Sequence, residues 1–250
     1  MERNGGKSGG RAARSAFLCA VVLVTGLARA SDPPASLVNP VTVHIEITDT
    51  VWSGADNNVR HVVNPGGGQP LQVTTLTTNA ADDLAPHIAA SPAGSVWVTW
   101  YRTVTPAQIV SRKRSAANNT WAAETLVSDA GEDSRSPSIT HDGAAPWWAW
   151  VVSANGQAQI AVTGGSDAPD PLPTRTIVGT TNFAGTIDPA ILYESAHLWI
   201  TWVDSASNVG WVTYDYTQHA WSGVSRESYA NANDSVAAAR ARIRTQVLGN

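Results

Sequence analysis

Short apolar or alternating runs, separated by Gly, Pro, Asn and Asp, fill the chain from about residue 41 to residue 230. Such runs predict β-strands joined by hairpin-length turns. Four consecutive strands per stretch form an antiparallel meander. The predicted strands are 87–91, 96–102, 108–114 and 121–128 in one stretch, 138–141, 147–152, 157–163 and 175–179 in the next, and 190–193, 198–203, 209–214 and 221–228 in the third.

One outline recurs along this pattern. The run PHIAASPAGSVWVTWYR, from Pro86 to Arg102, returns in 137–150 and in 189–202, and a degraded copy ends at Trp52. The tryptophans that anchor the copies are separated by 48, 50 and 52 residues, at Trp52, Trp100, Trp150 and Trp202. A near-constant period of this length indicates a repeat architecture.

The repeat predicts an all-β fold, a β-propeller of about four blades, because an isolated four-stranded meander is not stable and must stack on its neighbours. Trp97, Trp148 and Trp199 precede the anchors and would help to fill the space between blades. Four blades could form a closed ring, an open fragment or a protomer that completes a ring by assembly. The last alternative would make the protein a homo-oligomer.

The C-terminal stretch, residues 231–250, has a different character. It is rich in helix formers, Ser235 can cap a helix start and Gly249 can end it. Val236, Ile243 and Val247 would form an apolar stripe, with three arginines opposite. We predict a helix; the alternation in ARIRTQVL leaves a strand as the alternative.

Residues 1–30 have the layout of a secretory signal peptide, with a basic start, an apolar stretch over 15–27 and the small-residue signal Ala28-Arg29-Ala30. A retained membrane anchor is the alternative. Residues 31–40 form a Pro-rich lead-in to the repeats at 41–230. We therefore predict export to the periplasm or the medium.

Charge and composition limit the classes of partner that the protein can bind. Removal of residues 1–30 takes away five basic residues and one acidic residue, which leaves 11 Lys and Arg against 19 Asp and Glu and a net charge of −8. This balance argues against a nucleic-acid partner. No later stretch is apolar enough to span a membrane. The single cysteine, Cys19, lies in the predicted signal peptide, whereas 11 Trp against 2 Phe is unusual.

Residues that differ between copies are candidates for function, because the shared scaffold does not require them. Two positions after the anchor Trp, the copies carry Gly54, Arg102, Val152 and Asp204, and Tyr101 precedes Arg102. A sugar stacks on an aromatic face while its hydroxyls form hydrogen bonds. The candidate ligand-binding residues are Tyr101, Arg102, Trp147, Trp148 and Asp204. Alternatively, these are strand ends that face water.

The run P-x-I…G-x-V-W-V-x-W…I…R-S…W…L-V-S resembles the repeats of the sialidase-like (BNR-repeat) propeller superfamily, over residues 45–228. That family carries a Ser-x-Asp-x-Gly-x-x-Trp box between its third and fourth strands. The turn Ser115–Trp121 keeps the Ser and the Trp but lacks the Asp and the Gly, and Tyr214-Asp215-Tyr216 with Trp221 is looser. The resemblance implies the fold more than the activity.

Sialidases need an arginine triad, a Tyr/Glu pair and an acidic residue. Tyr101-Arg102-Thr103-Val104 only resembles one arginine motif, and Arg112-Lys113-Arg114 is more typical of a solvated strand face. No catalytic residue is therefore predicted. The six His show no metal-binding spacing, and the acidic turns 129–133 and 167–170 are more typical of solvated loops than of Ca²⁺ sites, so no metal or cofactor is predicted.

These features favour a secreted, non-catalytic propeller that binds a glycan or a protein. The alternatives are a divergent sialidase-like glycoside hydrolase and a structural repeat protein without a small ligand.

Overall fold

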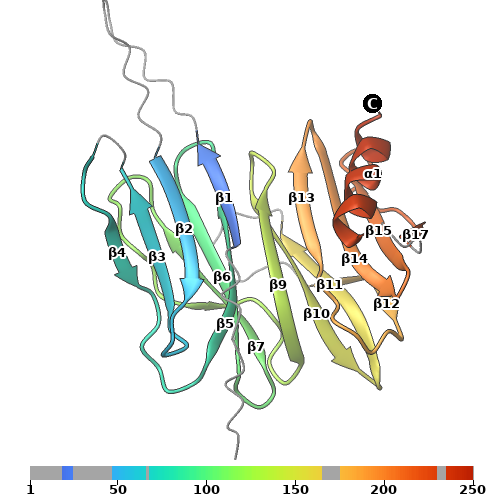
Figure 1. Cartoon of the computed structure of the whole chain (residues 1–250), viewed down its shortest axis with the longest axis horizontal. Coiled ribbons are helices and arrows are strands. Elements are labelled where there is room, and N and C mark those ends of the chain that lie inside the picture. The colour runs from blue at the N-terminus through green and yellow to red at the C-terminus, as the bar shows by residue number, and fades with distance from the viewer. Residues whose placement is uncertain (1–18, 25–46, 66–67, 165–174, 230–234, 250) are drawn as a thin grey trace, which may run out of the picture.

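The computed structural model describes residues 19–24, 47–65, 68–164, 175–229 and 235–249. Four antiparallel sheets follow one another along the chain, and a single helix follows them in the described residues (Figure 1). Within each sheet the strands are hydrogen-bonded largely in chain order, which is the predicted meander. The all-β prediction is confirmed.

The elements have the following bounds. The first sheet contains β1 (Cys19–Val24), β2 (Ile47–Ser53), β3 (Val59–Asn64) and β4 (Gln72–Thr75), and the second contains β5 (Asp83–Ala90), β6 (Val96–Arg102), β7 (Gln108–Arg114) and β8 (Thr125–Leu126). The third contains β9 (Asp133–His141), β10 (Pro146–Ala154), β11 (Gln157–Gly164) and β12 (Thr176–Thr181). The fourth contains β13 (Ala190–Glu194), β14 (His197–Ser205), β15 (Asn208–Asp215), β16 (Ala220–Trp221) and β17 (Ser225–Ser228), and α1 spans Val236–Leu248.

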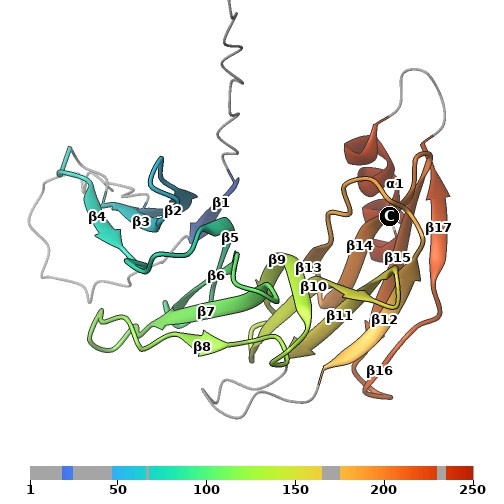
Figure 2. The same cartoon turned by 90° about the horizontal axis from the view of Figure 1, so that it is seen from below.

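The sheets are arranged as the blades of an incomplete β-propeller. The first strands of successive sheets contact one another, since β5 contacts both β1 and β9, and β9 contacts β13. Figure 2 shows the four sheets along an arc whose ends, the first and fourth sheets, lie apart. We therefore call the sheets blades one to four.

The anchor tryptophans fill the spaces between blades. Trp100, Trp150 and Trp202 are fully buried, and each packs against the preceding blade. Burial of each indole contributes roughly 3 kcal/mol or more. Trp52 is only half-buried, because its face of blade one has no preceding blade among the described residues.

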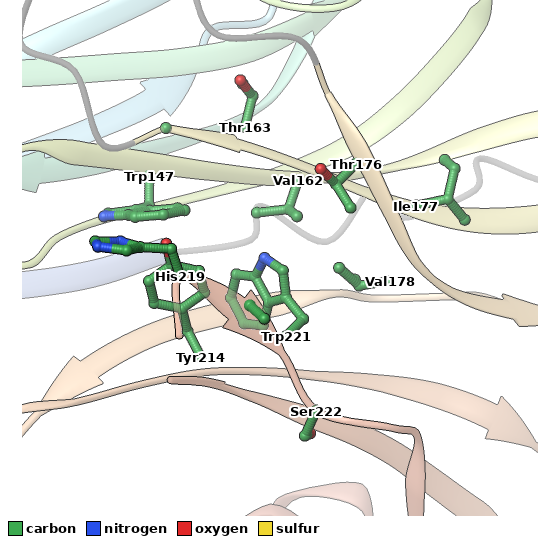
Figure 3. Close-up of a pocket in the computed structure, with 12 residues that line it drawn as sticks. Trp147, Val162, Thr163, Thr176, Ile177, Val178, Tyr214, His219, Trp221 and Ser222 are labelled. Carbon is green, nitrogen blue, oxygen red and sulfur yellow. The ribbon is translucent and has the colours of Figure 1, made fainter. Parts of the chain in front are cut away.

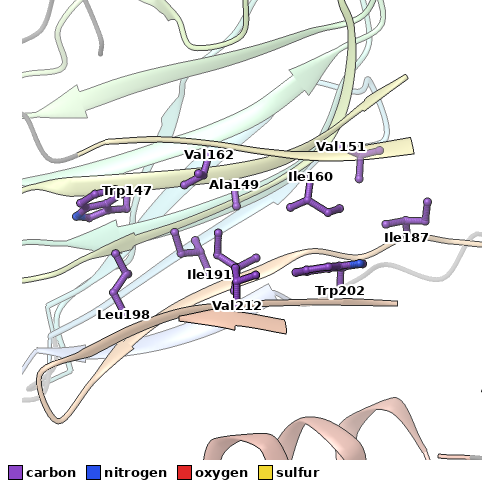
Figure 4. Packing of buried hydrophobic residues seen from close by; sticks show 11 residues of the cluster. Trp147, Ala149, Val151, Ile160, Val162, Ile187, Ile191, Leu198, Trp202 and Val212 are labelled. Carbon is purple, nitrogen blue, oxygen red and sulfur yellow. The ribbon is translucent and has the colours of Figure 1, made fainter. Parts of the chain in front are cut away.

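Blades three and four share the largest of these apolar layers. Alternate residues of β10 (Trp147, Ala149 and Val151) point toward blade four. They meet side chains from β13, β14 and β15 (Figure 4). The intervening residues Trp148 and Trp150 point the opposite way, into the layer with blade two. Successive side chains of a strand point to opposite faces, so neighbouring tryptophans serve different interfaces.

Helix α1 covers the outer face of blade four, where a fifth blade would otherwise stack. Ala239 and Ile243 are fully buried against Trp199 and Val209. The Ser235 side chain accepts a hydrogen bond from the Ala238 amide. Gly249 ends the helix with a left-handed φ of 71°. The predicted helix is confirmed.

The outermost strands differ from the prediction. The expected strand 121–128 shortens to β8, with only an isolated bridge at Trp121, and the expected strand 221–228 divides into β16 and β17. At the division the Ser222 amide still donates to the Thr213 carbonyl, but the Thr213 amide donates to the Ser222 hydroxyl and not to its carbonyl, so the backbone ladder is interrupted. The predicted strand over 43–48 shifts to β2, and its residues 43–46 lie outside the described residues.

The N-terminal strand overlaps the predicted signal peptide. Strand β1 pairs antiparallel with β2 at the inner edge of blade one. Cleavage after Ala30 would therefore remove one strand of that blade. Strand β1 lies within residues 1–30, where the signal peptide is predicted. Export of the chain stays a prediction.

Candidate functional site

The predicted candidates lie at two different ends of equivalent strands. Tyr101 and Arg102 end β6, and Asp204 lies near the end of β14. Trp147 and Trp148 instead begin β10, which is the same second strand of its blade. Trp148 is buried between blades two and three, away from Trp147. The five residues therefore do not form one cluster.

Arg102 has its charge occupied within blade two. Its guanidinium donates to Asp83, at 2.8 Å from Nε to Oδ1, and to both oxygens of Glu124 at 2.9 Å. Asp83 is fully buried and also accepts a 2.9 Å hydrogen bond from Trp100 Nε1. A buried carboxylate needs such partners, so this arginine contributes to blade structure.

Asp204 is similarly engaged, because its carboxylate accepts from the Arg226 guanidinium and its carbonyl accepts a 2.7 Å hydrogen bond from Thr181 Oγ1. Tyr101 is half-buried and packs against the layer between blades two and three. Both residues thus take part in contacts within the scaffold.

Trp147 lines a pocket between blades three and four (Figure 3). The cavity has a volume of about 470 Å³. Three aromatic side chains contribute to its wall, Trp147 from β10, Tyr214 from β15 and Trp221 from β16. Polar side chains also line it, namely Thr163, Thr176, His219 and Ser222. Its volume falls within the range of small-molecule sites.

The three rings pack at steep angles to one another. The Trp147 and Tyr214 ring centroids are 4.9 Å apart, and those of Tyr214 and Trp221 are 5.1 Å apart. Trp147 and Trp221 meet edge to face, at 6.1 Å and 84°. Trp147 is 8% exposed, whereas Tyr214 and Trp221 are half-buried. The wall therefore combines a rigid buried ring with two more accessible ones.

Asp142, in the turn between β9 and β10, fixes the buried ring. Its Oδ2 accepts a 2.8 Å hydrogen bond from Trp147 Nε1 and a 3.1 Å hydrogen bond from the Tyr216 hydroxyl of blade four. Its Oδ1 accepts from the amides of Ala144 and Ala145. Burial alone would raise the pKa of Asp142, but these donors lower it overall, so the carboxylate is ionised at neutral pH.

The corresponding place between blades one and two is built differently. In blade two Trp121 pairs with Arg114, and in blade four Trp221 pairs with Tyr214. Trp121 therefore corresponds to Trp221, and Arg114 corresponds to Tyr214. There Arg114 contacts Asp49, with an N–O distance of 3.2 Å. An ion pair thus stands where blade four presents Tyr214, and the aromatic wall is a departure from the repeat.

Sequence reasoning found Trp147 but missed Tyr214 and Trp221. The signal was present, because Arg114 and Tyr214 occupy matching positions in two copies and differ in chemistry. Tyr214 and Trp221 flank the turn before the outermost strand, away from the anchor tryptophans where the copies are most easily aligned.

The acidic turns and the histidines give no metal centre in the described part of the chain, where no group of three or more His, Cys, Asp or Glu side chains gathers. In the turn 129–133, Asp129 and Glu132 contact the Arg175 guanidinium. The turn 167–170 lies outside the described residues. None of the helices in the described residues is long and apolar enough to cross a membrane.

No protein-family model matches the sequence, and no curated protein matches it either. Among solved structures, Trypanosoma rangeli sialidase is similar with a TM-score of 0.47 and 8% identity, covering 71% of this chain and 35% of that one. An exo-beta-1,3-galactanase from Phanerochaete chrysosporium is similar with a TM-score of 0.46 and 9% identity, covering 73% and 49%. The Bombyx mori GH32 beta-fructofuranosidase BmSUC1 has a TM-score of 0.45 at 9% identity, covering 74% and 47%.

This chain thus spans about half or less of the length of these proteins. Similarities at these TM-scores carry no argument about family or activity.

Proposed function

We propose that this protein binds a carbohydrate in the pocket between blades three and four. The observation that carries the proposal is the wall formed by Trp147, Tyr214 and Trp221 in one cavity of about 470 Å³. Export by the predicted signal peptide, to the periplasm or the medium, would bring such a site into contact with glycans.

The chemistry of a sugar suits this wall. A pyranose presents an apolar C–H face that packs on an aromatic ring, while its rim of hydroxyls seeks hydrogen bonds. Trp221 and Tyr214 are accessible enough to supply the stacking surface. His219 is exposed in the same lining, and its imidazole can form hydrogen bonds with hydroxyls. The pocket therefore offers both parts of sugar recognition.

Preorganisation strengthens the proposal. The Asp142 carboxylate holds the Trp147 indole from blade three and the Tyr216 hydroxyl from blade four. A wall that is already rigid loses little side-chain entropy when a ligand binds. Binding would thus require no rearrangement of the buried ring.

A glycan array with the purified full-length chain, followed by calorimetry on the ligands found, tests the proposal. We expect Trp221→Ala to weaken binding by about ten-fold or more, because it removes a stacking surface. Trp121→Ala is the matched control, since Trp121 holds the equivalent place between blades one and two, and it should retain binding. Equal loss in both variants would contradict the pocket.

Tyr101 and Arg102, the predicted binding residues at the end of β6, provide a second test of where the site lies. The double variant Tyr101→Ala/Arg102→Ala should bind as the wild type does if it remains folded by circular dichroism. Loss of binding in this variant, with Trp221→Ala unaffected, would move the site to the ends of β6 and β14. Turnover of fluorogenic sugars that Arg102→Ala abolishes would instead assign a glycoside hydrolase.

A further inference from the structure

The charges around the aromatic pocket bear on which sugar it takes, an inference that rests on the proposed function. None of the residues that line the pocket within the described part of the chain is a lysine or an arginine. Arg175 directly precedes the lining residue Thr176, but its guanidinium contacts the carboxylates of Asp129 and Glu132. Apart from the titratable His219, the described lining thus offers no cationic side chain to an acidic sugar.

Two carboxylates adjoin residues of the aromatic wall, Asp142 in space and Asp215 along the chain. Asp142 accepts from Trp147 Nε1 at 2.8 Å. Asp215 is exposed and adjoins Tyr214, and its Oδ1 accepts from the backbone amides of Thr217 and Gln218. Each carboxylate therefore contacts or adjoins a residue of the wall.

Both carboxylates act electrostatically on the Tyr214 phenol. Burial raises the pKa of Tyr214, and the charges of Asp142 and Asp215 raise it further. The nearest charge in contact with the wall is thus the carboxylate of Asp142, 2.8 Å from Trp147 Nε1, and no lysine or arginine of the described lining offsets it. The faces of aromatic rings are themselves electron-rich and attract cations.

We propose that the site selects a sugar that carries a protonated amine, a hexosamine with a free amino group, over neutral and acidic sugars of the same ring. The pyranose face stacks on the accessible rings, and the ammonium group lies in the negative potential of Asp142 and Asp215. The same ammonium chemistry occurs in choline-type headgroups, which serve as a separate arm of the test.

Calorimetric titration of the full-length protein with four ligands at one salt concentration tests this proposal. Glucosamine, glucose, N-acetylglucosamine and glucuronate share one ring and differ in charge. We expect glucosamine to bind about five-fold or more tighter than glucose and N-acetylglucosamine, and glucuronate to bind weakest. The preference for glucosamine should shrink in high salt, because the carboxylate of Asp215 is screened there.

Asp215→Asn removes one charge while its side-chain oxygen can still accept the two amide hydrogen bonds. It should reduce the preference for glucosamine over glucose by about two-fold or more and leave glucose affinity nearly unchanged. Asp56→Asn is the matched control, since it removes an exposed carboxylate of blade one that pairs with Arg60, and it should keep the full preference.

The outcomes separate the two proposals. Equal affinity for glucosamine and glucose, with both lost in Trp221→Ala, would overturn the charge selectivity and support sugar binding. Absence of binding to every sugar would overturn both. Binding of choline without any sugar would also overturn both, and would reassign the pocket to quaternary amines.

Discussion

Asp142 joins two blades through one carboxylate, which accepts from Trp147 of blade three and Tyr216 of blade four. Asp142→Asn turns one of the two carboxylate oxygens into an NH₂ group, which faces hydrogen-bond donors and cannot accept from them. We expect a loss of about 1–3 kcal/mol in the free energy of unfolding, because buried donors lose their acceptor. Urea denaturation at pH 7 measures it, and an unchanged midpoint would contradict this role.

The same carboxylate predicts a pH dependence. Because the pKa of Asp142 is lower in the folded protein than in the unfolded chain, its contribution is complete above the unfolded value of about 4 and is lost as pH falls through the folded value. The stability difference between wild type and Asp142→Asn should be constant from about pH 7 to 5 and should shrink below about pH 4. A difference that grows on acidification would contradict the assignment.

Trp202 requires two glycines beside it. A Cβ at Gly179 would lie 2.5 Å from Trp202 Cζ2, and one at Gly210 would lie 2.8 Å from Cε2. We expect Gly210→Ala to destabilise the protein by about 1–3 kcal/mol through overpacking, measured by thermal and urea unfolding. Gly223→Ala is the control, since its Cβ meets nothing within 4 Å and should change stability little.

At single positions, comparison of the copies was informative only where the scaffold repeats closely. It singled out Arg102, whose charge is used by Asp83 and Glu124, whereas Trp147, which lines the pocket, was a candidate as an aromatic residue and not as a difference between copies. A sequence pattern does not show that Asp83 is buried and needs a cation. Contacts between residues 19 positions apart, such as this pair, follow from the fold and not from local periodicity.

Among the elements, α1 depends on one buried face. Ile243 is fully buried against blade four, whereas Gln246 is exposed on the same helix. Ile243→Ala should cost about 2–4 kcal/mol, and Gln246→Ala should stay within about 0.5 kcal/mol. Equal, small effects on the free energy of unfolding would show that the helix does not pack on the blade.

The inner strands and the helix were predictable from sequence, because each carries a strong apolar pattern or a cap. The outermost strands were not, since their residues are mostly exposed and tertiary hydrogen bonds decide where they pair. Ser222 shows this, because its hydroxyl accepts from the Thr213 amide in place of its backbone carbonyl and so interrupts the strand. Strand β1 was also missed, because an apolar run near a chain start has the same pattern as a signal peptide.

For the whole molecule, the first blade provides a test of processing. If the predicted signal peptide is cleaved after Ala30, the exported protein begins at Ser31 and lacks β1. Amides of β2 that face β1 should then exchange faster than in the full-length chain, because their partner strand is absent. Mass spectrometry of the exported protein identifies its N-terminus, and a mass that includes residues 19–24 would contradict cleavage.

The four blades form an open arc, and completion of a ring by assembly of several chains stays a prediction. Blade four is covered by α1, whereas Trp52 of blade one remains half-buried. Light scattering of the exported protein distinguishes a monomer from an assembly that completes a ring.

The most direct test of the sugar site is the indole region of a ¹H–¹⁵N NMR spectrum during titration with the preferred sugar. Each of the 11 tryptophans gives one Nε1–H signal, which reports the surroundings of that indole. We predict that the Trp147 and Trp221 signals shift with a common saturation curve, while Trp100 and Trp121, in the layer between blades one and two, stay fixed. Shifts confined to tryptophans outside the pocket between blades three and four would contradict the site.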